Sequence, residues 1–234
     1  SCDQCHTNCR ISRGQQLGLK ASVIMEKIDV NTWKRKAHFN FFQSFEEPYF
    51  GVTARVDVTQ AQQYCAQHKL SFFLFYLHAT LKAANSIENF KYRIDQDGAP
   101  YSCTQIDASA TIMRPNETFG FSYIPYVANF SAFAKAATTE IERVKTSEDL
   151  FPPFNPDHVL HCSAIPWLDF TAITHSRAYS RRDSVPKISY GKVVDTAGKK
   201  QMSVAVFSHH GLIDGLHVSR FFKAFQELLS HPSH

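Results

Sequence analysis

The residues best suited to chemistry lie near the C-terminus, in the run His-His-Gly-Leu-Ile-Asp-Gly-Leu-His over residues 209–217. Successive side chains of a strand point to opposite faces, so His209 and His210 cannot serve one site together. We expect His209 to face the core and His210 to face a cleft, where Gly211 allows a ligand to approach closely. A neutral imidazole in a cleft is a general base for a hydroxyl group near pH 7.

The same run has two other interpretations. A core histidine with satisfied hydrogen bonds would explain His210 without catalysis, and His209, Asp214 and His217 have the side-chain types of a metal site. Asp214 and Gly215 fall at the expected turn from strand to helix, where glycine permits a positive φ. We expect His209 and His217 to pack or hydrogen-bond, and no metal to bind.

The elements that must position this run form a mixed pattern without a strict strand–helix–strand rhythm. Asp97-Gly98 is typical of a hairpin turn, and Thr59 is a candidate N-cap. Strands are predicted over residues 51–58, 108–113, 118–123, 158–164, 169–174, 187–194 and 202–208. Helices are predicted over residues 59–68, 71–84 and 128–144 and in an amphipathic segment around residues 220–229. The pattern predicts one α/β domain in which helices pack on a mixed, largely antiparallel sheet, giving two layers.

Composition and charge exclude several classes of protein. The chain has 234 residues, of which 44% are hydrophobic and 20% charged, so it is neither disordered nor a disulfide-rich mini-protein. A net charge of +4 is too small to indicate nucleic-acid binding but suits a partner that carries phosphate. The 20 Phe and 9 Tyr residues indicate an aromatic core or an aromatic-lined pocket. We find no run of apolar residues long enough to span a membrane.

The cysteines are unevenly distributed. Cys2, Cys5 and Cys9 cluster with His6 and fit either a c-type haem attachment pattern or a zinc site, although this polar stretch offers neither a haem pocket nor a second ligand pair. We expect residues 1–24 to be a flexible extension without a signal peptide, and residues 25–234 to form the functional domain. The remaining cysteines are isolated, as in a reduced cytoplasmic protein: Cys65, Cys103 and Cys162.

Several motifs in the same order resemble those of the chloramphenicol acetyltransferase family. His210 and Asp214 belong to the motif His-His-x-x-x-Asp-Gly, which that acyltransferase superfamily shares. The other motifs are Trp33-Lys-Arg35-Lys-Ala-His38-Phe39, Asn116-Glu117-Thr118-Phe119, Ser163-Ala164-Ile-Pro166-Trp167, and Pro186 with Ser189 and Lys192. The resemblance extends from about Met25 to the C-terminus, and several motifs in order are far more specific than one.

The resemblance implies a role for each matching residue. His210 would be the general base of an O-acetyltransferase that uses acetyl-coenzyme A, and Ser163 would donate its hydroxyl to the tetrahedral oxyanion. Asp214 would pair with Arg35 to hold the turn, and Ser189 would order a water molecule near the intermediate. Residues implied to line the acceptor pocket are Phe41, Phe42 and Phe119. On composition alone, these phenylalanines are better explained as core than as pocket.

The resemblance also implies a cytoplasmic homotrimer in which His210 faces the neighbouring subunit. Chloramphenicol or a related hydroxylated compound would be the acceptor, which implies antibiotic resistance. Cys162 precedes Ser163, so alkylating this thiol would crowd the oxyanion position if a reagent reaches it. Five basic residues are candidates for the phosphates of coenzyme A, or form a solvated face: Arg181, Arg182, Lys187, Lys199 and Lys200.

The sequence departs from the family at the acceptor pocket. By counting from the motifs, Glu46 and His175 replace residues that are apolar in the drug pocket, and Phe207-Ser208 replace the residues before the histidine pair. A carboxylate and an imidazole facing an apolar drug would cost a few kcal/mol unless they are paired or hydrated, so a different acceptor is an open alternative. A non-catalytic ligand-binding protein on the same fold is the other alternative.

Overall fold

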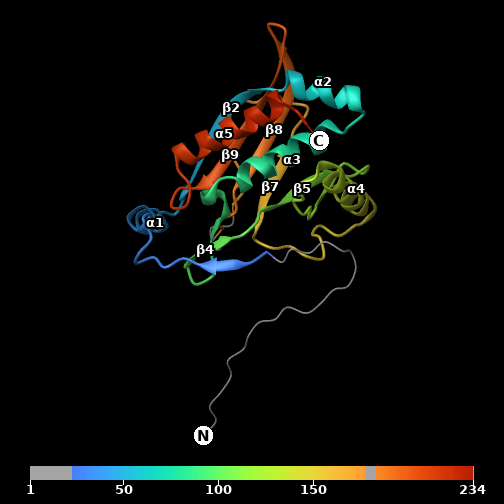
Figure 1. The fold of residues 1–234 in the computed structure, drawn as a ribbon. Coiled ribbons are helices and arrows are strands. Elements are labelled where there is room, and N and C mark those ends of the chain that lie inside the picture. Colours follow the sequence, from blue (N-terminus) through green and yellow to red (C-terminus); the bar gives the residue numbers. More distant parts are fainter. Residues whose placement is uncertain (1–22, 178–182, 234) are drawn as a thin grey trace.

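The computed structural model describes residues 23–177 and 183–233. A six-stranded sheet has the strand order β2-β9-β8-β7-β5-β6, and a small three-stranded sheet has the order β1-β4-β3 (Figure 1). The strands of the large sheet are β2 (Tyr49–Asp57), β5 (Asp107–Met113), β6 (Phe119–Phe121), β7 (Val159–Ala164), β8 (Lys187–Thr196) and β9 (Lys199–His209). The small sheet contains β1 (Met25–Lys27), β3 (Tyr92–Ile94) and β4 (Pro100–Cys103).

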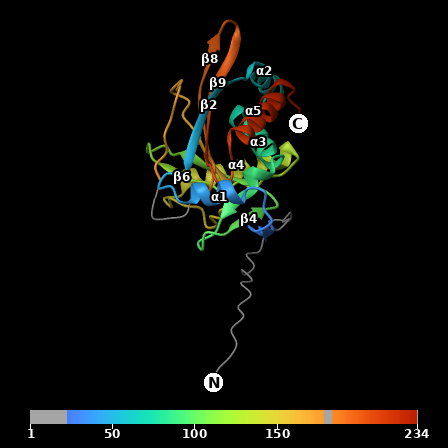
Figure 2. The ribbon, with the colours of Figure 1, turned by 90° about the vertical axis from the view of Figure 1, so that its left-hand side faces the viewer.

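The large sheet is mixed, as predicted. β2, β9 and β8 run antiparallel to one another, β8, β7 and β5 are parallel, and β6 returns antiparallel to β5. The helices are α1 (Lys36–Gln43), α2 (Thr59–His68), α3 (Phe72–Asn85), the short 3₁₀ helix η1 (Glu88–Lys91), α4 (Phe130–Thr146) and α5 (Gly215–Ser230). Helices α2, α3 and α5 lie on one side of the sheet (Figure 2). The predicted two-layer α/β class is confirmed.

Hydrophobic patterning explains the layer of helices. In α5, Phe221, Phe225 and Leu229 recur every four residues, so they share one face, and all three are fully buried. α3 is buried almost all round, and Ser71 caps its start by accepting a hydrogen bond from the Leu74 amide (3.4 Å). None of the helices within the described residues is long and apolar enough to cross a membrane.

A buried arginine connects the two sheets. Arg93 on β3 has no exposed surface, and its guanidinium donates hydrogen bonds to the carbonyls of Phe90, Tyr92, Asp157 and Val159 at 2.7–2.9 Å. Several carbonyl dipoles thus replace the water that the charge loses on burial.

Two local predictions are wrong. Residues 169–174 form no strand, because the Asp169 carboxylate accepts hydrogen bonds from the side chains of Arg55 (2.7 Å) and Ser203 (3.1 Å). These side-chain bonds place the segment against the sheet without backbone pairing. Thr59 is the first residue of α2 rather than its N-cap, and its hydroxyl accepts a hydrogen bond from the backbone amide of Lys200 (2.9 Å).

The alternation of β9 divides its side chains between two faces. Met202, Val204 and Val206 pack into the hydrophobic core with the helices. Ser203, Ala205, Phe207 and His209 belong to the opposite face, which is crossed by the segment between β7 and β8. Phe170 of that segment packs above Gly191, and the His175 and Phe207 rings are 5.2 Å apart.

Ser208 interrupts the apolar side of β9. Its Oγ is buried and has no hydrogen-bond partner among the described residues, and the side chain has no exposed surface. An unpaired buried hydroxyl carries a desolvation penalty.

We predict that Ser208→Ala raises the free energy of unfolding by about 1 kcal/mol, because the penalty disappears with the hydroxyl. Ser203→Ala is the matched control: it removes the hydrogen bond to Asp169 and should lower the free energy of unfolding by about 1 kcal/mol. Urea unfolding of both variants measures the difference. A loss of stability in both would show that the Ser208 hydroxyl is satisfied.

Candidate active site

His210 lies just beyond the end of β9, between two aromatic rings. The imidazole stacks on Phe42 with ring centroids 4.1 Å apart and planes within 4°, and the Phe50 ring is 4.3 Å away on a tilted plane. The His210 amide donates a hydrogen bond to the Pro48 carbonyl (2.8 Å). The ring is half-buried, and its Nδ1 has no hydrogen-bond partner within the part of the chain that the structure describes. The aromatic rings thus restrict the plane of the imidazole.

Arg35 holds the turn that carries His210. It precedes α1, is 7% exposed, and donates to the Asp214 carboxylate (2.8 Å) and to the backbone carbonyls of Gly211 and His210 (both 3.3 Å). Burial raises the pKa of Asp214, but the hydrogen bond from Arg35 and the nearby positive charges outweigh burial and hold that pKa below its usual value. The expected Arg35–Asp214 pair is therefore present in the structure.

Asp214 also caps helix α5. Its side chain accepts a hydrogen bond from the Leu216 amide (3.1 Å), while the Asp214 amide donates to His217 Nδ1 (3.1 Å). His217 thus has the hydrogen-bonding role expected of it. Gly215 does not have the expected positive φ, because it is the first residue of the helix and Asp214 before it is extended.

Gly211 lies in a tightly packed turn. A Cβ at this position would lie 3.1 Å from the His209 ring and 3.4 Å from the Phe39 backbone. A side chain here would therefore require the His209 ring or the turn to move by a few tenths of an ångström.

Ser163 lies elsewhere, in a row of side chains on the face of the sheet opposite the helices. In register across the strands, Ser163 on β7 is beside Ser189 on β8, which is beside Ala205 on β9. The hydroxyl of Thr111 on β5 is hydrogen-bonded to the hydroxyl of Ser163, with 3.3 Å between the two oxygens. Ser163 is half-buried and can be reached by a ligand.

His175 covers Ser189 in this row. Ser189 has no exposed surface, and its Oγ lies 3.4 Å from Nε2 of the half-buried His175. Burial first, and then the charge of Lys187, lowers the pKa of His175, so its imidazole is neutral near pH 7. His175, rather than Ser189, is therefore the polar group that this end of the row presents to a ligand.

The remaining predicted pocket residues are dispersed. Phe41 is 59% exposed on α1, and Glu46 is exposed in the loop that follows this helix. Phe119 is 46% exposed on the edge strand β6. One chain therefore places Phe41, Phe42 and Glu46 on the His210 side of the molecule, and Ser163, Ser189 and His175 in the polar row.

Ser163 and His210 are too far apart to act on one substrate within a chain. His210 lies five positions beyond Ala205 and two strands from β7, which separates the residues by roughly 20 Å at about 3.4 Å per residue and 4.8 Å per strand. The alternation of β9 also directs His210 to the face opposite Ser163.

Sequence reasoning missed Phe50 and Thr111. Phe50 begins the alternating pattern of β2, so its period-two spacing from Val52 was an available signal. No local signal pairs Thr111 with Ser163, because β5 and β7 are joined only by the register of the sheet.

Cys162 does not behave as the sequence suggested. It points into the core on the side opposite Ser163, is 2% exposed, and burial raises the pKa of its thiol to about 12. A reagent therefore does not reach it in the folded protein. Cys65 and Cys103 are also buried and unpaired. The cluster of Cys2, Cys5, His6 and Cys9 lies outside the described residues, within which no group of metal-ligating side chains occurs.

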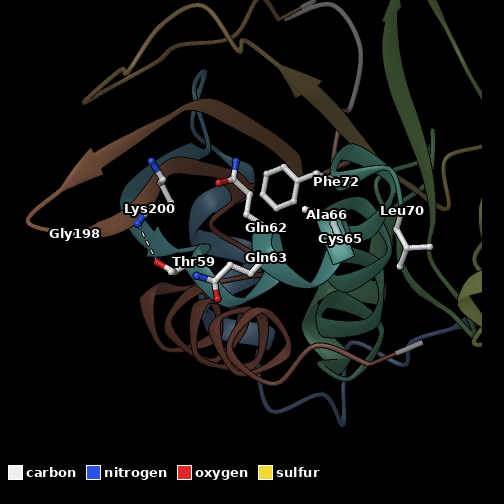
Figure 3. A pocket seen from close by; sticks show the side chains of 9 residues that line it. All are labelled: Thr59, Gln62, Gln63, Cys65, Ala66, Leu70, Phe72, Gly198 and Lys200. Carbon is white, nitrogen blue, oxygen red and sulfur yellow. Dashed lines mark hydrogen bonds between the residues drawn. The ribbon is translucent and has the colours of Figure 1, made fainter. Parts of the chain in front are cut away.

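A separate cavity of about 520 Å³ lies at the other end of β9, between α2, Phe72 and the tip of the β8–β9 hairpin (Figure 3). Lys200 lines it and pairs with Asp195 (3.0 Å), while Lys199 pairs with Asp57 (3.6 Å). Lys187 is buried against Asp183. Each of these lysines thus already has a carboxylate partner. Arg181 and Arg182 lie outside the described residues.

Comparison with known proteins gives consistent matches. The family model described as chloramphenicol acetyltransferase matches residues 23–226. A chloramphenicol acetyltransferase of Bacillus pumilus is 26% identical over 211 residues, 89% of this chain and 94% of the relative. Chloramphenicol acetyltransferase 3 of Escherichia coli is 26% identical over 204 residues, 86% of this chain and 95% of the relative.

Solved structures that superimpose on this chain agree with the family match. One described as a chloramphenicol acetyltransferase superimposes with a TM-score of 0.81 at 34% identity, covering 88% of this chain and all of the other. The dihydrolipoamide acetyltransferase of Azotobacter vinelandii has a TM-score of 0.63 at 14% identity, covering 83% of this chain and 86% of the other. The latter is similar in fold alone.

The buried residue His209, beside the turn, makes the stability of the protein depend on pH. His209 is 4% exposed, and its Nδ1 accepts a hydrogen bond from the Gly211 amide (3.1 Å). Burial, followed by the charge of Arg177, lowers its pKa to about 4. Between that value and the unfolded pKa of about 6.5, only the unfolded chain binds the proton. The free energy of unfolding is therefore not reduced by this titration above about pH 6.5. Below that pH it falls, as the pH decreases, by up to about 1.4 kcal/mol per pH unit.

The variant His209→Asn removes this titration and keeps an acceptor near the Gly211 amide. We predict that the slope of unfolding free energy against pH decreases, between about pH 6 and pH 4.5, by about 1.4 kcal/mol per unit. Urea unfolding at a series of pH values measures the slope. The same slope in the variant and the wild type would show that His209 is charged in the folded protein.

Proposed function

Because the chain belongs to the chloramphenicol acetyltransferase family, and is therefore an acyltransferase as its motifs predicted, we propose that it transfers the acetyl group of acetyl-coenzyme A to a hydroxyl of a small acceptor, chloramphenicol or a related compound. The observation that carries the proposal is His210, stacked between Phe42 and Phe50 on a turn that Arg35 and Asp214 hold. We assign this activity to residues 25–234.

His210 acts as the general base. Its imidazole removes the proton from the acceptor hydroxyl as the oxygen attacks the carbonyl carbon of the acetyl thioester. The carbon–sulfur bond of the tetrahedral intermediate then breaks, and the proton passes from the imidazolium to the sulfur that leaves. The products are the acetyl ester and the free thiol of coenzyme A. The aromatic rings keep the imidazole in one plane through both proton transfers.

Ser163 stabilises the tetrahedral intermediate. Its hydroxyl donates a hydrogen bond to the oxygen that becomes negatively charged when the acceptor attacks. The half-buried position of Ser163 supports this role, because a donor in a partly desolvated site acts on the oxyanion more strongly than one in water.

The active site is completed between subunits of a homotrimer. Within one chain His210 and Ser163 are separated by roughly 20 Å and lie on opposite faces of the sheet, so His210 of one subunit must meet Ser163 of another. Head-to-tail contacts between two different surface patches close into a ring, which the family resemblance implies to contain three subunits.

Two exposed aromatic patches support that contact. Beside His210, Phe41 and Phe45 are 59% and 42% exposed; at the opposite edge of the sheet, Phe119 and Phe151 are 46% and 53% exposed. Clustered exposed rings mark surfaces that bind other proteins. In this assembly each patch covers part of the acceptor pocket of the neighbour.

The pocket favours an acceptor with an additional polar group. The neutral imidazole of His175 lies above Ser189 in the row that contains Ser163. An acceptor with a hydrogen-bonding group near its reactive hydroxyl satisfies this imidazole, whereas a purely apolar surface leaves it unpaired. An acyltransferase that prefers such an acceptor over chloramphenicol is therefore the second candidate function.

Acetyl-coenzyme A is produced inside cells, which places the proposed reaction in the cytoplasm. Buried free thiols at Cys65, Cys103 and Cys162 are compatible with this reducing compartment. If chloramphenicol is the acceptor, its acetylation confers resistance to that antibiotic.

The variant His210→Ala tests the general base. With saturating acetyl-coenzyme A, release of free thiol should be measured with chloramphenicol and with more polar hydroxylated acceptors. We predict a decrease in kcat of roughly 10²-fold or more on the best acceptor, because no other group takes the proton. His231→Ala, which removes an exposed histidine of α5's C-cap, is the control and should remain fully active. No thiol release by the wild type with any acceptor would refute the proposed function.

Mixed oligomers test the shared site. Neither His210→Ala nor Ser163→Ala is expected to support normal turnover alone. When the two chains are co-expressed with different tags and mixed trimers are purified, one of the three interfaces in each trimer, about one third, combines an intact His210 with an intact Ser163. Activity should recover to about that fraction of the wild type. No recovery in verified mixed trimers would place both residues in a site within one chain.

A further inference from the structure

We propose that Thr111 is a positioning residue for Ser163: its hydroxyl oxygen lies 3.3 Å from Ser163 Oγ, and it donates to that oxygen when Ser163 donates its only proton to the oxyanion. The proposal rests on the proposed function, because it concerns the direction in which Ser163 donates. Thr111 itself need not touch the substrate.

The register of the sheet places these two hydroxyls side by side. Ala110 is paired with Cys162 on the parallel strands β5 and β7, so the next residues, Thr111 and Ser163, are neighbours on the opposite face. Their oxygens are 3.3 Å apart, within hydrogen-bonding distance of each other. Both strands are internal to the large sheet, so the backbone holds the two residues in register.

The single proton of the Ser163 hydroxyl makes the direction of this contact important. Ser163 has one proton to donate and two lone pairs that accept. A Ser163 that donated to Thr111 would have no proton for a developing oxyanion. In the arrangement that we propose Thr111 is the donor, so one lone pair of Ser163 is occupied and its proton is free to point toward a ligand.

The neighbour on the other side does not compete for that proton. Ser189, the register partner of Ser163 on β8, forms its side-chain hydrogen bond with His175 Nε2 (3.4 Å), and no hydrogen bond joins the Ser163 and Ser189 hydroxyls within the described residues. Thr111 is therefore the side chain that orients Ser163, and its branched Cβ restricts rotation about χ1, which limits the directions in which the hydroxyl donates.

Three variants and a double-mutant cycle test the proposal. Thr111→Val is nearly isosteric and removes the hydroxyl, and Thr111→Ser keeps it. Thr53→Val is the matched control, because Thr53 lies on β2 in the same row, beside Ala205, and is separated from Ser163 by β9 and β8. Thermal unfolding of each variant verifies that the chains are folded.

We expect Thr111→Val to lower kcat by about 10-fold with little change in KM, since part of the effect of an oxyanion donor is lost. Thr111→Ser should restore kcat to within about threefold of the wild type, and Thr53→Val should leave it unchanged. In the Ser163→Ala background, Thr111→Val should have no further effect, because there is no Ser163 hydroxyl left to orient.

The possible failures are distinguishable. A wild type that releases no thiol refutes the proposed function and this inference with it. An active wild type with equal losses from Thr111→Val in both backgrounds refutes the positioning role alone. The same conclusion follows if Thr111→Val retains full kcat, or if Thr111→Ser is as impaired as Thr111→Val. Full activity of Ser163→Ala refutes the oxyanion role and therefore the inference, while acetyl transfer itself stands.

Discussion

The contact of Arg35 with Asp214 and with two carbonyls of the turn is the interaction on which the His210 side of the molecule depends. One guanidinium connects the start of α1 to the turn after β9 and to the N-cap of α5, both of which lie more than 170 residues later in the sequence. Because α1 also carries Phe42, the same contact places the ring that stacks on His210. The carboxylate thus acts on the histidine through the backbone and not by a direct hydrogen bond.

The two faces of the large sheet differ in polarity. One face is apolar and packs against α2, α3 and α5, which fixes the strands in register. The other carries hydroxyls and imidazoles in rows, of which Thr111, Ser163 and Ser189 form one. A polar row of this kind depends on the apolar face behind it, because register is strongly specified only where one face is buried.

Local sequence patterns predicted much of this molecule and failed where long-range contacts decide. Alternation identified β2, and the Asp97-Gly98 turn was correct, since both depend on neighbouring residues. The strand predicted over residues 169–174 is absent because Asp169 bonds the side chains of Arg55 and Ser203, far away in the sequence. The motifs predicted the Arg35–Asp214 pair. They could not predict that His175 covers Ser189, which depends on how the preceding segment crosses the sheet.

The proposed sharing of the active site between subunits has a consequence for how the protein would behave in a cell. An active site that forms only between copies of a chain has a concentration that depends on self-association as well as on the amount of chain. Freshly synthesised monomers are then inert, and catalytic output rises more steeply than expression until the subunits are saturated with one another. A gene dose too low to populate the assembly would yield folded protein with almost no turnover.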